Sequence, residues 1–207
     1  SGITKKLPLP DNVHAFGTRK PVSFVHETTG VVLHGWSYRD RDTRDNLASS
    51  YPAPHPNRFN IGVLHTALTG RPPHALYAPC TVQELAAKGY DYWALGHVHD
   101  FEIVSEAPYI VYPGNLQGRN VREVGPKGAV LVTVQDDRIE GVPEHVALDA
   151  VRWFRAVLDV ADLASEVELQ QRLSVALERA HSKHADGKPL MVRVILQGEC
   201  TMHGELA

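Results

Sequence analysis

The sequence predicts an α/β fold with parallel strands, followed by a small α+β segment. An apolar stretch, FNIGVLH (Phe59–His65), is followed by a helix-initiating TVQE and then by a second apolar run, YWALG (92–96). This strand, helix, strand order favours parallel strands with a right-handed crossover. A similar order recurs near the end of the chain, where RWFRAVLDV (152–160) and PLMVRVILQG (189–198) flank a helical stretch. The 207 residues, 43% of them hydrophobic, are enough for one domain and an appendage.

Short segments rich in β-branched and aromatic residues dominate the first part of the chain. Three of them are expected to be strands: VHAF (13–16), VSFVH (22–26) and VVLHGW (31–36). ETTG separates the last two strands and predicts a hairpin. A short helix is expected after Asp42 or Thr43, and three prolines between residues 51 and 58 predict a loop.

The central strand, helix, strand unit has clear boundaries. FNIGVLH is almost continuously apolar, which is typical of a strand covered on both faces. Thr81 and Glu84 form a capping box, in which each side chain accepts from the other residue's free amide. With Gly89 as a stop, the helix is predicted over residues 82–88. Further strands are predicted at 109–113, 129–134 and 138–142, the last two joined by a tight hairpin at QDD (135–137).

A boundary is expected at PEH (143–145), which divides the chain into residues 1–145 and a small capping segment, 146–207. SEVE (165–168) is a second capping box. The helix after it has an apolar face, and HADGK ends it. Because about 60 residues rarely form an autonomous domain, this segment is expected to pack on the first. The face is formed by Leu169, Leu173 and Leu177, with Ala176 and Ala180 beside them.

Composition excludes several classes of protein. The net charge of −3 gives no general basic field, so a nucleic-acid role needs a local patch. Cys80 and Cys200 fit no metal or redox spacing and are expected to be idle thiols in a reducing cytoplasm. No apolar run approaches the roughly 18 residues of a membrane span, so no membrane association is expected.

Three histidines come directly after apolar strands. His65 closes one strand, and His97 and His99 lie just beyond the next in GHVH. Residues i and i+2 of an extended chain point the same way, and the carboxyl ends of parallel strands meet at one edge of a sheet. Neutral imidazole is a common metal ligand, so we expect a metal site there. Three histidines alone suit zinc. Two ions would need bridging carboxylates; Asp91 and Asp100 lie nearby, but the sequence does not force a bridging geometry on either.

The motif GHVH after YDYWAL resembles the metal motif of calcineurin-like metallophosphoesterases. The segments 64–100 and 112–134 are similar to the SbcD-like DNA-repair exonuclease branch, and VRWFRAVLDV resembles the entry to its capping domain. The resemblance covers essentially the whole chain. It implies the C-terminal half of a four-layer α/β/β/α sandwich with a partial capping domain.

The resemblance also implies a function and a set of site residues. His65 and His97 would ligate one divalent ion and His99 a second, with manganese usual and zinc, iron or magnesium as other ions. The pair of ions would hydrolyse a phosphodiester. Asn115 and Arg119 lie in a loop expected near the substrate, where Arg119 is either a phosphate contact or part of a surface ion pair. DNA would be the substrate, a coiled-coil ATPase a partner, and the location cytoplasmic.

The sequence departs from this family at one end. The family begins with D-x-H, GD and GNHD motifs, which supply the bridging aspartate and the catalytic histidine, and none occurs here. Ser1–Thr4 resembles the residues that lie directly after GNHD in the family. The chain is therefore expected to be the second part of a longer enzyme, inactive alone and without catalytic residues of its own. Homodimers would form through the missing N-terminal half.

Three alternatives remain open from the residues. One is a metallophosphoesterase acting on another phosphoester, because the metal site would be the same. Another is a binding module that has lost catalysis, which the missing motifs allow. The third is a single zinc site formed by histidines only.

Overall fold

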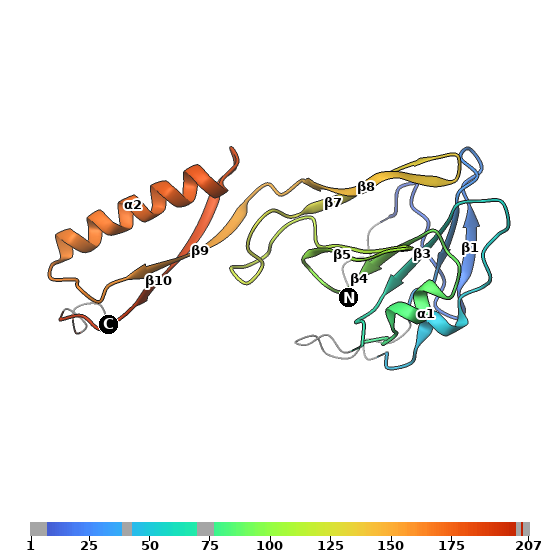
Figure 1. Ribbon diagram of the computed structural model, residues 1–207, viewed down its shortest axis with the longest axis horizontal. Helices are drawn as coiled ribbons and strands as arrows, with labels where there is room; N and C mark the ends of the chain where they lie inside the picture. Colours follow the sequence, from blue (N-terminus) through green and yellow to red (C-terminus); the bar gives the residue numbers. More distant parts are fainter. Residues whose placement is uncertain (1–7, 39–42, 70–76, 202–203, 205–207) are drawn as a thin grey trace. The chain divides into compact units, whose positions relative to one another are not determined.

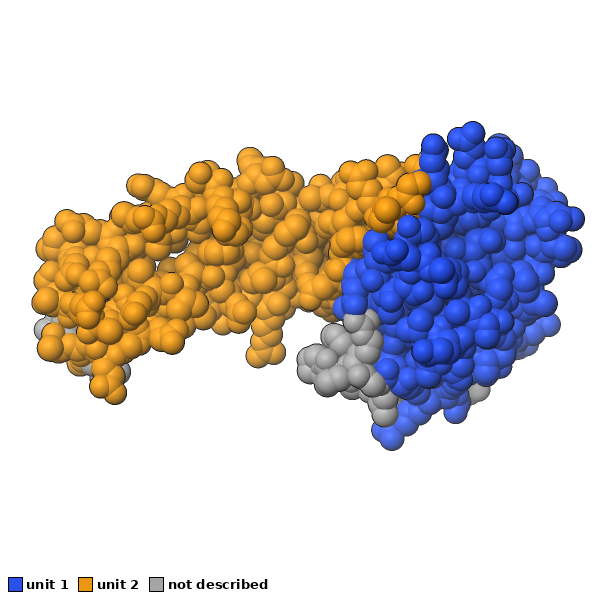
Figure 2. All heavy atoms as spheres, in the orientation of Figure 1, with its two compact units in different colours: residues 1–98, 102–112, 134–140 blue, residues 99–101, 113–133, 141–207 orange. Residues whose placement is uncertain are grey.

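The computed structural model describes residues 8–38, 43–69, 77–201 and 204 (Figure 1). The fold is mixed α/β, as predicted, with sheets of six, two and two strands. The chain divides into two compact units (Figure 2). Unit 1 comprises residues 1–98, 102–112 and 134–140, and unit 2 comprises residues 99–101, 113–133 and 141–207. The resemblance carried by Ser1–Thr4 lies outside the described residues.

The six-stranded sheet has the order β1-β2-β3-β4-β6-β5. β1 and β2 are antiparallel, whereas the pairs β2–β3, β3–β4 and β4–β6 are parallel. The predicted hairpin and the predicted parallel pair are therefore both confirmed. The strands are β1 (Val22–Val25), β2 (Val32–Gly35), β3 (Asn60–His65), β4 (Tyr92–Gly96), β5 (Phe101–Glu106) and β6 (Tyr109–Pro113).

The crossover between β3 and β4 contains α1 (Val82–Ala86). Thr81 and Glu84 form the predicted capping box, because the Thr81 side chain accepts from the Glu84 amide and the Glu84 carboxylate from the Thr81 amide. Leu85 is fully buried, and its carbonyl accepts a hydrogen bond from the buried indole of Trp93 at 3.1 Å. This bond fastens the helix to β4.

Gly62 in β3 lies directly against the indole ring of Trp93, where an added Cβ would come within 2.3 Å of the ring. The ring is fully buried and stacks on Tyr90, so it has little room to move. Gly62→Ala is expected to lower the free energy of unfolding by about 1–3 kcal/mol, measured by urea denaturation. Gly17→Ala is the control, because a Cβ there meets nothing within 4 Å. Equal effects of the two substitutions would refute this prediction.

A buried histidine connects β1, β2 and β3. His34 is fully buried, with Nε2 3.0 Å from Asn60 Oδ1 and Nδ1 2.8 Å from the Ser23 hydroxyl. Asn60 donates its Nδ2 hydrogens to the carbonyls of Arg58 and His55, so its Oδ1 faces the imidazole as an acceptor. Nε2 therefore carries the hydrogen, and Nδ1 accepts from Ser23. Burial of the ring favours its neutral form.

His34 is expected to make stability sensitive to acid. Burial lowers the pKa of His34 below its ordinary value of 6.5, and His55 lowers it further, against the hydrogen bond to Asn60. The unfolded chain therefore binds a proton at a higher pH than the folded chain does. The contribution of neutral His34 is complete above pH 6.5 and is lost as the pH falls from there toward the lowered folded pKa.

Urea denaturation at stepwise pH below neutrality tests this linkage. His34→Gln should reduce the loss of unfolding free energy with acid, because the titrating group is gone. His26→Gln is the matched control, since His26 is exposed in the same unit and should leave the slope unchanged. An unaltered slope in His34→Gln would exclude His34 as the source of the acid sensitivity.

β7 (Gly128–Gln135) and β8 (Arg138–Ala147) form the hairpin predicted at QDD. Asp136 and Asp137 both have positive φ, 50° and 57°, as the tight turns that join twisted strands require. β8 continues past residue 145, so the predicted boundary falls within a strand. The division into residues 1–145 and 146–207 stays a prediction.

The end of unit 2 is a parallel strand pair and one long helix. β9 (Arg152–Asp159) and β10 (Leu190–Gln197) pair along their whole length, and α2 (Glu166–His184) connects them. Ser165 caps the helix by accepting from the Glu168 amide. The Glu168 carboxylate accepts from the Ala164 amide instead of Ser165, so this capping box is formed only in half.

Several further details differ from the sequence prediction. The helix predicted over residues 82–88 ends at Ala86. Residues 13–16 form no strand, because the Val13 amide turns back to the Pro10 carbonyl. The short helix predicted after residue 42 or 43 is a 3-10 helix, η1 (Leu47–Ser50). β5 was not predicted, since its apolar residues do not follow a clear alternation. On α2, Leu177 is 40% exposed although Leu169 is buried. Within the described residues, no helix is long and apolar enough to cross a membrane.

Candidate metal centre

Two of the predicted ligands lie at the carboxyl edge of the parallel strands in unit 1. His65 is the last residue of β3 and is the register partner of Gly96, the last residue of β4. The amide of Thr66 donates to the Gly96 carbonyl at 3.1 Å, which extends the ladder to the end of the strand. His97 is the next residue after Gly96. The parallel pairing therefore brings His65 and His97 to neighbouring positions at one edge.

Gly96 leaves space for the ring of His65. A Cβ at this position would lie 2.9 Å from Nδ1 of His65, closer than real Cβ atoms approach other groups. The absence of a side chain thus allows the His65 imidazole to lie against the backbone of β4.

The imidazoles of His65 and His97 contact each other edge to face, with ring centroids 5.3 Å apart and an interplanar angle of 86°. Two imidazole nitrogens bound to one ion at about 2.1 Å and a near-tetrahedral angle would place the centroids about 5 Å apart. The separation of the two rings is therefore compatible with a shared divalent ion. His97 has a φ of 112°, rare for a residue with a side chain, and such strain is common at functional sites.

Tyrosine rings surround the pair. Tyr77 stacks on His97 at 5.6 Å and meets His65 edge to face at 5.3 Å, and Tyr38 lies 5.6 Å from His65. These rings restrict the orientation of both imidazoles. The sequence does not indicate Tyr77 and Tyr38 as site residues, because both lie outside strands and helices, where no periodicity shows what a side chain contacts.

The other predicted residues gather in unit 2 around Glu123. Its carboxylate accepts from His99 Nδ1 at 2.8 Å, from Asn115 Nδ2 at 3.1 Å and from Arg119 Nη2 at 2.9 Å. The backbone amide of Arg119 adds a fourth hydrogen bond at 2.7 Å. The hydrogen bond from Arg119 is the main reason that the pKa of Glu123 is far below its ordinary value; the amide, His99 and Asn115 add to it, against partial burial. Glu123 was missed, although its four-residue spacing from Arg119 suits an ion pair.

The structure assigns the three histidines to two units. β4 ends at Gly96 and His97 leaves the extended conformation, so the alternation that predicted a common direction for His97 and His99 does not apply to them. His97 belongs to unit 1 and His99 to unit 2. Within the described part of the chain, no three His, Cys, Asp or Glu side chains are grouped to hold a metal. The ligand roles of His65, His97 and His99 stay predictions.

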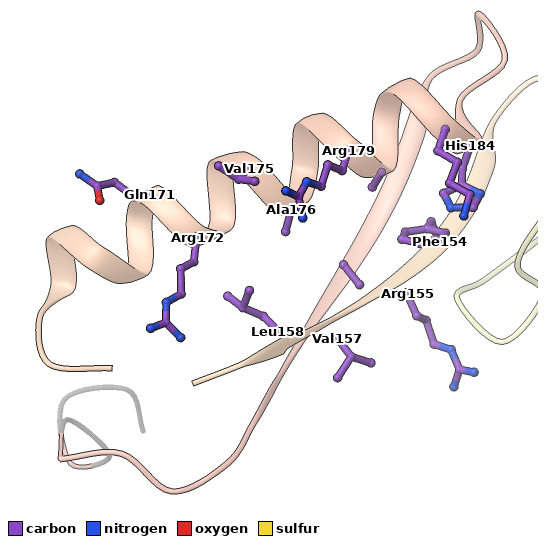
Figure 3. A pocket seen from close by; sticks show the side chains of 13 residues that line it. Phe154, Arg155, Val157, Leu158, Gln171, Arg172, Val175, Ala176, Arg179 and His184 are labelled. Atoms are coloured by element: carbon purple, nitrogen blue, oxygen red, sulfur yellow. The ribbon is translucent and has the colours of Figure 1, made fainter. Parts of the chain in front are cut away.

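Unit 2 also has an open groove of about 560 Å³ between α2 and β9 (Figure 3). Apolar side chains from both elements line it, including Leu158 and Ala176. Basic side chains border these apolar ones. They are Arg155, Arg172, Arg179, Lys183 and His184.

Known proteins resemble the chain in two ways. Residues 153–207 match the family described as the middle domain of metallophosphoesterase YhaO. The chain is also 36% identical over 196 residues to the uncharacterized metallophosphoesterase YhaO of Bacillus subtilis (strain 168). This alignment includes 93% of the chain and 47% of the relative, so the chain spans about half the length of that protein.

Proposed function

Because the chain is similar to a metallophosphoesterase along 93% of its length, we propose that it contributes part of the metal centre of a phosphoester hydrolase. The contact between His65 and His97 carries this proposal, since two imidazoles 5.3 Å apart suit one divalent ion. His99 would ligate a second ion. Manganese is the ion we expect, and zinc, iron and magnesium are the other candidates.

The chain's own residues would orient the metal ligands and the phosphate. When bound, a pair of divalent ions activates water and stabilises charge on phosphoryl oxygens. Gly96 and Tyr77 fix the directions of the His65 and His97 rings. Arg119 is 65% exposed and is held by Glu123 beside His99, so its guanidinium can contact a phosphate without giving up that ion pair.

The finer proposal is a manganese-dependent DNA exonuclease of the SbcD-like branch, acting in DNA repair. The basic residues around the α2–β9 groove favour a polyanion, and its apolar lining suits the faces of unpaired bases. A coiled-coil ATPase is the proposed partner, and homodimers are the proposed assembly.

Hydrolysis assays on the protein encoded by the complete reading frame test both proposals, the phosphoester hydrolase and the DNA exonuclease. A chromogenic phosphodiester, single-stranded DNA and double-stranded DNA are each incubated with manganese, zinc, magnesium or no added metal. Manganese-dependent release of nucleotides from DNA ends supports the exonuclease. Hydrolysis of the small ester alone would indicate another phosphoester as substrate. Absence of both hydrolysis and bound metal would favour a non-catalytic binding module.

The 207-residue chain is expected not to hydrolyse DNA by itself. Its sequence contains none of the D-x-H, GD and GNHD motifs, and no three metal-binding side chains gather among the residues that the structure describes. Two divalent ions without a bridging carboxylate would repel each other strongly. The assay is nucleotide release with manganese, beside the longer protein as a positive control. Clear activity of the short chain would overturn this expectation.

A further inference from the structure

Glu123 is a partly buried acceptor surrounded by four donors. Its side chain is 11% exposed, whereas that of His99 is 46% exposed. Oε1 accepts from His99 and the Arg119 guanidinium, and Oε2 accepts from Asn115 and the Arg119 amide. An ionised carboxylate offers about four acceptor positions, so these contacts satisfy it.

This arrangement determines which ring nitrogen of His99 carries the hydrogen. A carboxylate only accepts, so the 2.8 Å contact to Oε1 requires a hydrogen on Nδ1 of His99. Arg119 Nη2 also lies 3.1 Å from Nδ1. An arginine only donates, and Nδ1 of His99 carries a hydrogen, so there is no hydrogen bond between these two nitrogens. They lie close together because both donate to Oε1 of Glu123. In neutral His99, the lone pair is then on Nε2, on the far side of the ring from Glu123.

The backbone of His99 is held independently of its ring. The buried ammonium of Lys127 donates to the His99 carbonyl at 3.0 Å. Gly114 lies so close that an added Cβ would be 3.0 Å from that carbonyl oxygen. His99 is therefore fixed at both its carbonyl and its Nδ1, and its other ring nitrogen, Nε2, has no hydrogen-bond partner among the residues that the structure describes.

We propose that Glu123 is a positioning residue that keeps the hydrogen of His99 on Nδ1 and so presents the Nε2 lone pair to a divalent ion. The inference rests on the proposed function, because it takes His99 as a metal ligand. A histidine ligand commonly donates its other ring nitrogen to a carboxylate, which fixes its tautomer and orientation. The same carboxylate holds Arg119, so one residue would orient a metal ligand and a phosphate contact together.

The tautomer is measured directly on the 207-residue chain without metal. Long-range ¹H–¹⁵N correlation spectra at about pH 8.5, where imidazoles are ordinarily neutral, distinguish a hydrogen on Nδ1 from one on Nε2. The wild type should carry it on Nδ1, and Glu123→Ala should move it substantially to Nε2. Arg119→Ala should leave it on Nδ1, since Glu123 still accepts. If His99 of the wild-type chain carries its hydrogen on Nε2, the inference is refuted without any variant. It is also refuted if Glu123→Ala folds and His99 keeps its hydrogen on Nδ1.

Metal binding to the complete protein separates this inference from the proposed function. Calorimetric titration with Mn²⁺ should show an affinity about 10–100-fold weaker for one ion in Glu123→Ala. Glu144→Ala, which removes an exposed carboxylate from the same unit, should bind as the wild type does. His99→Ala should lose the same ion. Two ions retained in His99→Ala would refute the ligand role of His99, whereas wild-type affinity in Glu123→Ala would refute the positioning role of Glu123.

Discussion

Replacing His97 with alanine in the complete protein is expected to lower kcat/KM for metal-dependent phosphodiester hydrolysis by more than about a hundredfold. Loss of a partner outside the ligand shell commonly costs about 10–100-fold, and a direct ligand should cost more. His97 lies against His65 with 5.3 Å between ring centroids, so the variant would leave one imidazole where the ion needs two. Steady-state hydrolysis and bound metal, measured on the same preparation, report the effect.

His26→Ala is the matched control for this experiment. His26 is an exposed histidine of unit 1 whose Nδ1 lies 2.9 Å from the Thr29 hydroxyl, and its loss should leave hydrolysis unchanged. Circular dichroism of both variants without metal checks that the fold is retained. A His97→Ala variant with wild-type activity and metal content would rule out His97 as a ligand.

Asp149→Ala is expected to lower the free energy of unfolding of unit 2 by about 3–5 kcal/mol. The fully buried Asp149 carboxylate accepts from Arg152 Nε at 2.9 Å and from Nη2 at 3.1 Å. Its removal would leave the buried guanidinium of Arg152 without its main counter-charge. Arg152 also donates to the His184 carbonyl at the end of α2, so the damage should reach both β9 and the helix.

Native-state hydrogen exchange of the β9 amides measures this loss, with Asp186→Asn as the control. Asp186 lies 3.7 Å from Arg152 and is 71% exposed, so its neutralisation should change the free energy by less than about 0.5 kcal/mol. The buried-charge argument fails if both variants exchange alike. Burial raises the pKa of Asp149, but the hydrogen bond and charge of Arg152 outweigh it, and the net pKa is lowered.

The sequence predicted the elements whose determinants are local. The apolar runs of β3 and β4 and the Thr81 capping box each depend on a few neighbouring residues, and the parallel order follows from the crossover between them. The position of His65 beside the end of β4 could therefore be predicted from the sequence. The strand expected at residues 13–16 was wrong because composition does not supply a ladder partner.

The parts that the sequence did not predict depend on contacts between distant residues. Glu123 meets His99 across 24 positions, and nothing in either local pattern indicates that contact. Tyr77 reaches His65 and His97 from an irregular segment. The expected common direction of His97 and His99 required extended backbone, and the φ of 112° at His97 removes that condition.

The register of β3 and β4 also determines where the chain tolerates a change in length. His65 is opposite Gly96, and this is the last of five consecutive residue pairs. An extra residue in the crossover loops lengthens only the connection and leaves every pair intact. An extra residue inside β4 reverses the faces of all residues beyond it and carries His97 away from His65. Insertions and deletions in natural variants should thus accumulate in the loops of the crossover, outside α1, and be excluded from residues 92–97.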